Sequence, residues 1–201
     1  MKAQVLKEIS PIENRPLELI ELPIPQPKQN EILVKISACG VCHTELDEIE
    51  GRLSPTKFPI ILGHEIVGRV ERLGQGAKRF KEGERVGIAW INWACGKCSF
   101  CLKGEENLCD KAKWTGKDVD GGYAQYTVVS EDFAYLIPKR FTDLEAALLL
   151  CAGVIGYRAL RLSGMEDNQV LGLYGFGASA HIVIQIAKYK FPNCRVFVFT
   201  R

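Results

Sequence analysis

The sequence predicts a two-domain α/β protein, with a β-rich domain over residues 1–152 and the first β-α-β part of a second domain over residues 153–201. Two observations support this prediction. Before residue 140, short alternating or apolar runs are separated by glycine and proline, as in strands joined by tight turns. After residue 142, helical stretches lead into two apolar runs with another helical stretch between them, which is the order of a β-α-β unit.

In the first domain, alternation and β-branched residues predict strands and one short helix. The expected helix covers residues 44–49, and the expected strands cover residues 1–7, 18–22, 31–36, 66–70, 84–88 and 123–129. Prolines between residues 23 and 27 separate the second strand from the third.

The second part begins with a helix-start signal, because Glu145 follows Thr142 at the spacing of a capping box. This helix is expected to continue through Leu150, and the next one to end before Gly164. The remaining elements are expected as a helix over residues 157–162, a strand over 170–174, a turn at Gly175, a helix over 178–188 and a strand over 195–199.

The composition is that of an ordinary globular protein and excludes several partners. Of the 201 residues, 47% are hydrophobic and 25% are charged, and 26 basic side chains balance 24 acidic ones, so there is no net field for nucleic acid or anionic lipid. The longest nearly apolar run, residues 146–157, is shorter than the roughly 18 residues of a spanning helix. No secretory signal is visible. We therefore expect a cytoplasmic protein without nucleic-acid or membrane partners, in which eight cysteines favour metal over disulfides.

The strongest motif is the run Cys95-x2-Cys98-x2-Cys101-x7-Cys109. Four thiolates at this spacing can close a tetrahedral shell and leave no position for substrate, which predicts a structural zinc site in a lobe over residues 95–109. An iron–sulfur ligand set or four unrelated thiols are the alternatives. Because the lobe has little apolar content, it should depend on the metal for its shape.

A second set of candidate ligands is spread along the chain. Cys42, His64 and Cys151 offer two thiolates and one imidazole, which is the ligand set of an open zinc site whose fourth position is left to water or substrate. The hydroxyl of Thr44 could face the same position. Spacing alone does not bring these residues together, so the site depends on the fold.

The motif Gly175-x-Gly177-x-x-Ala180 follows an apolar strand and opens a helix. In that context the first glycine permits a tight turn, the second lets the backbone approach a pyrophosphate, and the alanine allows close packing of helix on strand. The helix N-terminus would offer free amides to the phosphates. The motif therefore predicts dinucleotide binding, and a packing turn in another α/β protein is the alternative.

Several motifs agree in order along the chain: Cys42-His43-Thr44, Gly63-His64-Glu65-x2-Gly68-x-Val70, the four-cysteine lobe, Asp120-Gly121-Gly122-Tyr123-Ala124 and Cys151-Ala152-Gly153. Together they resemble the zinc-dependent medium-chain alcohol dehydrogenases, and the resemblance covers essentially all 201 residues. It implies a GroES-like catalytic domain followed by the start of a Rossmann nucleotide-binding domain. It also implies NAD or NADP as cofactor, and the two ligand sets predict two zinc ions per chain.

The resemblance implies a role for each residue of the open site. Cys42, His64 and Cys151 would bind the catalytic zinc, and Thr44 would start a proton relay. Glu65 lies where the family has a glutamate beside the zinc, close to the ligands or occasionally coordinating the metal.

Other residues keep two interpretations. His43 corresponds to a neighbour of the cofactor phosphates, or is purely structural. Trp90 corresponds to an aromatic residue that narrows the substrate pocket in some microbial members, or is a buried structural tryptophan. Cys39 and Cys194 belong to neither zinc set and are interpreted as small buried hydrophobes, and His181 as part of its helix.

The chain departs from the family in three respects. Glu45 stands where many members have aspartate, so we expect its contact near the zinc to be longer or re-aimed. Asp47 stands where many have a relay histidine, which leaves the outer end of the proton path open. Family members also usually continue well beyond this length. Since only two strands of a doubly wound sheet are present, we expect the 201-residue chain alone to bind zinc but to be a poor catalyst.

The implied reaction is reversible hydride transfer between a small alcohol and NAD(P), with zinc as Lewis acid and an aldehyde or ketone as the other partner. Another medium-chain dehydrogenase, acting on a polyol or an amino-acid-derived alcohol, is an alternative, although Cys151 argues against a polyol enzyme. A catalytically weak, zinc-stabilised fragment is an alternative from a different class. If the chain is full length, we expect a homo-oligomer.

The end of the chain favours NADP over NAD. Sites that prefer NAD usually place an acid on the ribose at the end of the second strand. No Asp or Glu occurs from Tyr189 to Arg201, and a basic side chain at Arg201 could meet a 2′-phosphate.

Overall fold

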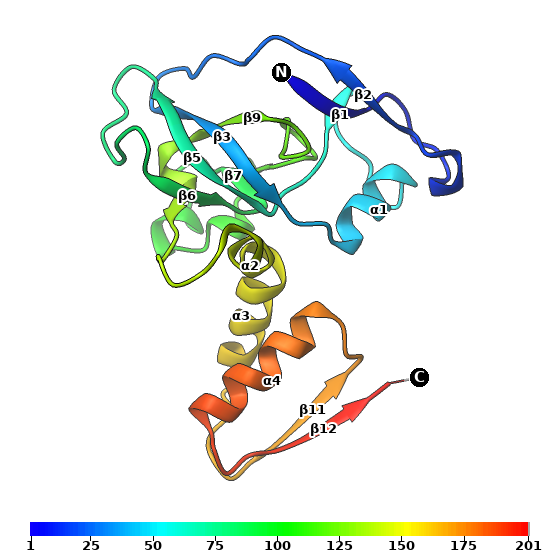
Figure 1. Ribbon diagram of the computed structural model, residues 1–201. Coiled ribbons are helices and arrows are strands. Elements are labelled where there is room, and N and C mark those ends of the chain that lie inside the picture. Colours follow the sequence, from blue (N-terminus) through cyan, green and yellow to red (C-terminus); the bar gives the residue numbers. More distant parts are fainter. Residues whose placement is uncertain (201) are drawn as a thin grey trace. The chain divides into compact units, whose positions relative to one another are not determined.

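The computed structural model describes residues 1–200 and divides the chain into two compact units, Met1–Ala147 and Leu148–Arg201. The first unit holds nearly all the strands, and the second holds one β-α-β unit and the helix before it (Figure 1). The division into compact units does not test the predicted domain boundary between residues 152 and 153, which stays a prediction.

The first unit is built around a five-stranded antiparallel sheet of order β10-β6-β5-β3-β9. Its strands are β3 (Glu31–Cys39), β5 (Ile66–Leu73), β6 (Arg85–Ile88), β9 (Tyr126–Ser130) and β10 (Ala134–Leu136). The sheet exists because alternate apolar side chains of these strands share one core, which includes Ile32, Val34, Ile66, Val86 and Val129. Each such aliphatic side chain contributes roughly 1.5–3 kcal/mol when fully buried.

A smaller sheet of order β2-β1-β4 lies in the same unit, with β1 (Lys2–Leu6), β2 (Leu17–Glu21) and β4 (Ile60–Ile61). Helix α1 (His43–Ile49) follows β3 and packs Ile49 into a core with Leu6, Ile60 and Leu62. The unit also contains an antiparallel pair of short strands, β7 (Ile91–Trp93) and β8 (Lys113–Trp114). It contains four 3-10 turns, at Ile12–Asn14, Cys101–Lys103, Glu106–Leu108 and Glu131–Phe133. The N-terminus of α1, the segment before β5 and the segment between β7 and β8 carry the candidate metal ligands of this unit.

The predicted helix start at Thr142 is confirmed. The Glu145 amide donates to Thr142 Oγ1 at 3.2 Å, and the Thr142 amide donates to Glu145 Oε2 at 2.8 Å, which is a capping box. Helix α2 (Asp143–Leu148) continues into a π-helical turn (Leu149–Gly153) and then into α3 (Val154–Leu162). The sequence predicted two separate helices, the second beginning at Tyr157. This was wrong: the helical backbone is continuous from Asp143 to Leu162, because no proline interrupts these residues.

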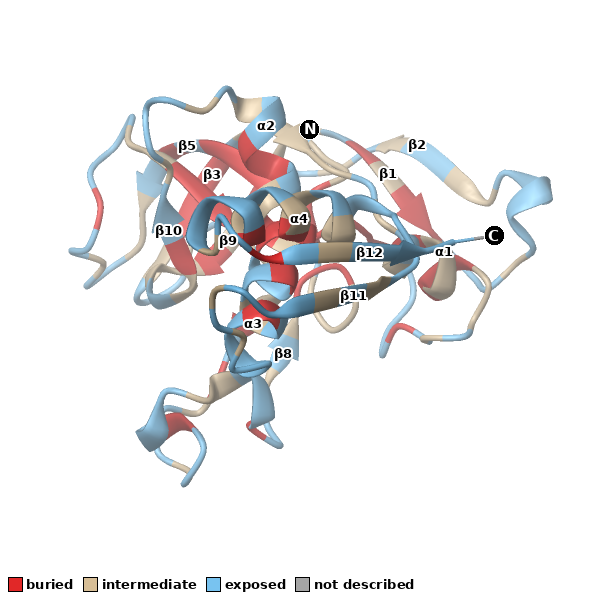
Figure 2. Ribbon diagram, turned by 90° about the horizontal axis from the view of Figure 1, so that it is seen from below, coloured by how far each residue is buried: buried red, intermediate tan, exposed pale blue. Residues whose placement is uncertain are grey.

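The second unit contains β11 (Val170–Tyr174), α4 (Ala178–Lys190) and β12 (Arg195–Phe199), and the two strands pair in parallel. Leu171, Leu173 and Val196 pack with α4, as the predicted β-α-β unit requires. Every other residue of β11 and most residues of β12 are exposed instead, and Figure 2 shows this as pale blue along β11 and β12, in contrast with the red of β3 and β5. Tyr174 and Phe199 stack on each other there, with ring centroids 4.7 Å apart.

Among residues 1–200, no helix combines the length and the apolar character that crossing a membrane requires. The predicted elements otherwise agree with the observed ones to within about three residues. The largest such differences are three residues: β9 begins at Tyr126 rather than at Tyr123, and β3 and β5 end at Cys39 and Leu73 rather than at residues 36 and 70.

Candidate functional site

The four predicted lobe cysteines come together. The Sγ atoms of Cys95, Cys98, Cys101 and Cys109 all lie within 4.8 Å of one another. The Sγ atoms of Cys98 and Cys101 are 3.5 Å apart and those of Cys95 and Cys101 are 3.9 Å apart. A tetrahedral zinc with Zn–S bonds of about 2.3 Å would set its sulfurs about 3.8 Å apart. The donor set and its spacing therefore fit a closed zinc site.

The lobe backbone also favours thiolates. Amides of Lys97 and Cys98 lower the pKa of the Cys95 thiol, whereas burial raises that of Cys101. Amide groups that converge on sulfur stabilise its negative charge, which is the form that binds metal. Among the described residues, the buried members of this lobe's cluster are Ala94, Cys101 and Cys109, with Ile91, Ala112 and Phe133 partly buried against them, so apolar packing around the lobe is limited.

A second group of ligand atoms forms at the start of α1 and in the segment before β5. Cys42 is the N-cap residue of α1, and His64 is fully buried just before β5. Cys42 Sγ lies 3.7 Å from His64 Nε2. A tetrahedral zinc bound to both would set sulfur and nitrogen about 3.6 Å apart, given Zn–S of about 2.3 Å and Zn–N of about 2.0–2.1 Å. These two atoms thus already have the separation of zinc ligands.

Glu45 connects the two candidate ligands. Its Oε2 accepts a hydrogen bond from the Cys42 amide at 2.8 Å, which completes a capping box, and its Oε1 lies 2.5 Å from His64 Nδ1. A carboxylate on the far nitrogen fixes the ring orientation and directs Nε2 towards the metal position. The structure thus gives Glu45 a close contact with the imidazole, and the expectation that this contact is longer or re-aimed relative to the family stays a prediction.

The charges around His64 follow from this geometry. Burial opposes a charge on the ring, but pairing with Cys42 and Glu45 outweighs burial and raises the pKa of His64 to about 10. A metal ion at Nε2 must therefore displace a proton, as is general for histidine ligands.

Glu65 lies with these ligands, whereas Cys151 belongs to the other unit. A carboxylate oxygen of Glu65 is within 4.8 Å of the ligand atoms of Cys42 and His64, and the side chain is 1% exposed. Cys151 lies half-buried in the π-helical turn Leu149–Gly153 of the second unit. Its part in the same site stays a prediction.

Two tryptophans stand beside the metal position. The Trp90 ring lies 6.1 Å from the His64 ring and 4.5 Å from that of Trp114. Among the described residues, no hydrogen-bond partner meets the buried Trp90 Nε1. Trp90 is thus packed in a small aromatic stack, and a role at the substrate stays a prediction. No sequence pattern pointed to Trp114, which pairs across from Ile91 and stacks on Trp90.

Glu48 was also missed. It is fully buried on α1, and within residues 1–200 neither of its oxygens has a hydrogen-bond partner. Burial raises the pKa of Glu48 to about 8; the charges of Glu45 and Cys42 add to this, and those of His64 and Lys117 oppose it. The helical period could have indicated it, because Glu48 follows Glu45 by three residues and so shares its face.

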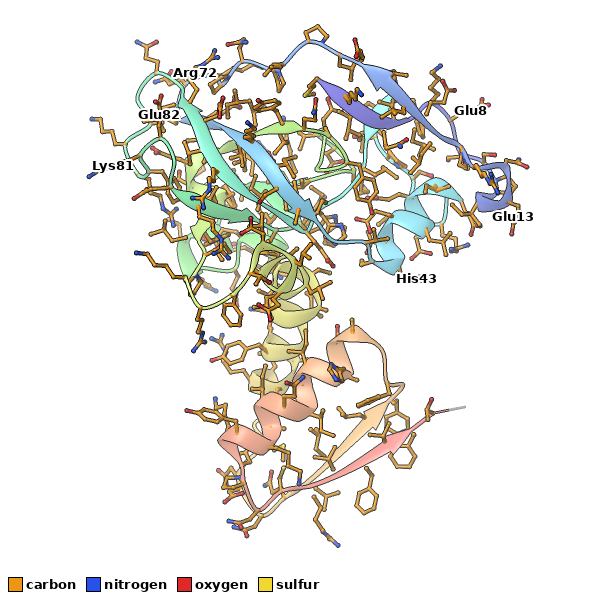
Figure 3. All side chains as sticks on the ribbon, viewed as in Figure 1. Glu8, Glu13, His43, Arg72, Lys81 and Glu82 are labelled. Carbon is orange, nitrogen blue, oxygen red and sulfur yellow. The ribbon has the colours of Figure 1, made fainter. Side chains whose placement is uncertain are left out.

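The predicted relay residues lie on the first turns of α1. The Thr44 amide donates to Cys42 Sγ at 3.3 Å. His43 is exposed at the start of the helix, as Figure 3 shows, and its Nε2 lies 3.6 Å from Asp47 Oδ1. Asp47 also pairs with Arg52 Nε at 2.5 Å. Asp47 therefore links the start of α1 to two basic groups at the surface.

The predicted dinucleotide motif has the expected backbone. Gly175 ends β11 with a φ of +87°, which favours glycine, and Gly177 is the extended N-cap residue of α4. Ala180 lies in the first turn of α4. Arg201, the candidate contact for a 2′-phosphate, lies outside the described residues.

The remaining candidates are structural. Cys194 is buried, as predicted, whereas Cys39 is only half-buried as a residue although burial raises the pKa of its thiol to about 12. His181 lies in α4, as predicted, where its carbonyl accepts from Gln185 Nε2 at 3.0 Å.

Comparison with known proteins agrees with this fold. Residues 28–139 match the family model described as alcohol dehydrogenase GroES-like domain. The chain is 45% identical over 206 residues to the probable alcohol dehydrogenase AdhA of Mycobacterium tuberculosis, covering 100% of this chain and 59% of that protein.

Two solved structures are also similar. A thermostable alcohol dehydrogenase from Pyrobaculum aerophilum with bound cobalt and zinc has a TM-score of 0.91 and 25% identity, covering 100% of this chain and 60% of that one. An acetophenone reductase from Geotrichum candidum in complex with NAD has a TM-score of 0.88 and 28% identity, covering 99% and 57%. The chain spans little more than half the length of these proteins. Since the matched domain alone covers more than half of its residues, the chain belongs to the zinc-type medium-chain alcohol dehydrogenases with a GroES-like domain.

Proposed function

We propose that this chain takes part in reversible hydride transfer between a small alcohol and a nicotinamide cofactor, at the site that contains Cys42 and His64. The observation that carries the proposal is the arrangement of Cys42 Sγ and His64 Nε2 3.7 Å apart, with Glu45 on the far nitrogen of the imidazole. Family membership supports the same reaction class.

Zinc would be held by Cys42, His64 and Cys151, and when bound it would supply Lewis acidity that favours the alkoxide form of an alcohol near neutral pH. A second zinc would be held by the four lobe cysteines. The acetophenone reductase and the Pyrobaculum enzyme, with bound NAD and with bound cobalt and zinc respectively, support this assignment of cofactors.

The chain's own residues would move the proton. The Thr44 hydroxyl is the proposed first proton acceptor, since Thr44 lies in the first turn of α1, two residues after the N-cap residue Cys42. Asp47 lies one helical turn further along, so it is the proposed outer end of the path in place of a histidine. His43, which pairs with Asp47, is proposed to face the cofactor phosphates.

The cofactor would lie at the turn between β11 and α4. Gly175, Gly177 and Ala180 give this turn the open backbone and the free helix amides that a pyrophosphate needs. A preference for NADP is proposed from the absence of acidic residues between 189 and 201. Comparing catalytic efficiency with the two cofactors tests this, and a clear preference for NAD would refute it.

The experiment for the main proposal combines metal analysis with turnover. Metal-replete protein is expected to hold two zinc ions per chain. It is expected to reduce NAD(P) only slowly with a panel of primary, secondary and amino-acid-derived alcohols, since the 201-residue chain alone is expected to be a poor catalyst. One zinc per chain would contradict the proposed zinc site either at Cys42 and His64 or in the four-cysteine lobe. Two zinc ions without turnover on any alcohol would favour the alternative of a zinc-stabilised protein that is catalytically weak. Turnover confined to an amino-acid-derived alcohol would favour the other alternative.

An alcohol or aldehyde substrate and a cytoplasmic location are also proposed, and a homo-oligomer is proposed if the chain is full length. Sedimentation of the purified protein measures the oligomeric state directly.

A further inference from the structure

Gly40 lies where the sheet ends beside the open metal site. It follows Cys39, the last residue of β3, which pairs with Ile66 on β5. The Gly40 amide donates to the Glu65 carbonyl at 2.9 Å, so Gly40 and Glu65 stand opposite each other one step beyond the ladder. Cys42 follows two residues later.

The Glu65 side chain fills the space that a side chain at position 40 would need. A Cβ built on Gly40 would lie 1.9 Å from Glu65 Oε2, 2.9 Å from its Cδ and 3.0 Å from its Cβ. These are the three nearest atoms, and all belong to Glu65. Because Gly40 is not among the glycines with positive φ, alanine could adopt its backbone conformation, and the nearest obstacle is the Glu65 side chain, its carboxylate above all.

We propose that Gly40 is a positioning residue of the metal centre: because it has no side chain, the carboxylate of Glu65 can fold over it and lie beside Cys42 and His64. This inference rests on the proposed function, since it assumes a divalent metal at those ligands. The carboxylate is buried and held within 4.8 Å of the sulfur and nitrogen ligand atoms, so it is placed to act on the ion or on its ligands.

The test measures Co²⁺ binding to the whole chain by its thiolate–cobalt absorption. The spectrum of Cys42→Ala, which retains the lobe set, is subtracted to isolate the open site. Gly40→Ala is expected to shift the cobalt absorption of this site and to weaken Co²⁺ binding by roughly 10–100-fold, as loss of a supporting carboxylate commonly does. An unchanged spectrum and affinity in Gly40→Ala would overturn the inference.

A second variant identifies the cause. In a Glu65→Ala background the colliding carboxylate is gone, so adding Gly40→Ala is expected to change Co²⁺ affinity by less than about threefold. If the single variant Gly40→Ala fails to fold, the double variant is expected to fold, since of the three nearest atoms only the Cβ of residue 65, at 3.0 Å, remains. An equal loss in both backgrounds, or a double variant that also fails to fold, would overturn the inference.

Gly122→Ala is the matched control for crowding. A Cβ there would lie 2.4 Å from Ile66 Cγ1 and 2.7 Å from Cys39 Sγ, so it crowds the same region while its three nearest atoms belong to Ile66 and Cys39 rather than to Glu65. It is expected to lower thermal stability and to leave the cobalt spectrum of the open site unchanged, whereas a shift equal to that of Gly40→Ala would overturn the assignment to Glu65. Absence of any difference between wild type and Cys42→Ala would instead refute the proposed metal centre itself.

Discussion

The four-cysteine lobe and the Cys42–His64 site present similar ligand atoms by different means. The lobe takes all its ligands from residues 95–109, a short segment with two 3-10 turns and limited apolar packing. The open site takes Cys42 from a helix N-cap and His64 from a buried segment before β5. The one is a local loop, and the other is assembled by a folded core.

This difference indicates what the metal does for each region. In the lobe, sulfurs that repel one another as thiolates have few other contacts to hold them, so the metal should supply the shape. At the open site, Glu45 already orients His64 and caps α1, so the ligands should stay in place when the ion leaves. The following predictions test that contrast, beginning with the largest expected effect.

The lobe should lose its structure when it loses its metal. Cys98→Ser is expected to lower the protection of lobe amides against hydrogen exchange by roughly 1000-fold, about 4 kcal/mol, because little else stabilises residues 95–109. Cys42→Ser is the matched variant at the open site and should leave protection around α1 nearly unchanged. Equal losses at the two sites would contradict the contrast.

Thr44→Ala tests the proton path of the open site. In a preparation that turns over alcohol, it is expected to lower turnover by roughly 10²–10⁴-fold without loss of zinc, because it removes a positioned proton acceptor. Thr44→Ser keeps the hydroxyl and should be mild. If the alanine variant is as active as the native protein, the relay begins elsewhere.

Glu48 should make the scaffold of the open site sensitive to pH. Its folded pKa is about 8 against an ordinary value of 4.5, so between these values the folded protein keeps a proton that the unfolded chain has lost. Stability contributed by Glu48 is therefore complete below about pH 4.5 and is lost as pH rises towards 8, by roughly 2–4 kcal/mol.

Urea unfolding of zinc-loaded protein from pH 5 to 8 measures this slope. Glu48→Gln is expected to flatten it, since the amide has no ionised form, and Glu82→Gln at an exposed position is the control. An unchanged slope in Glu48→Gln would show that the carboxyl ionises without cost in the fold.

Glu45→Gln should have the smallest effect. The amide can still accept the Cys42 hydrogen bond, but it loses the charge beside His64 Nδ1. Zinc affinity at the open site is expected to fall by roughly 10–100-fold in a chelator competition, with the lobe unaffected. Wild-type affinity would mean that the core alone orients the imidazole.

Sequence alone determined the features that depend on local order. The lobe spacing, the capping box at Thr142 and Glu145, the turn at Gly175 and most strands follow from patterns within a few residues, because each is stabilised by neighbours along the chain. Tertiary structure alone decided that Glu45 would reach His64, that Glu48 would be buried without a partner, and that Glu65 would fold over Gly40. These contacts join residues on different elements, and packing fixes their distances to fractions of an ångström that spacing along a sequence does not carry.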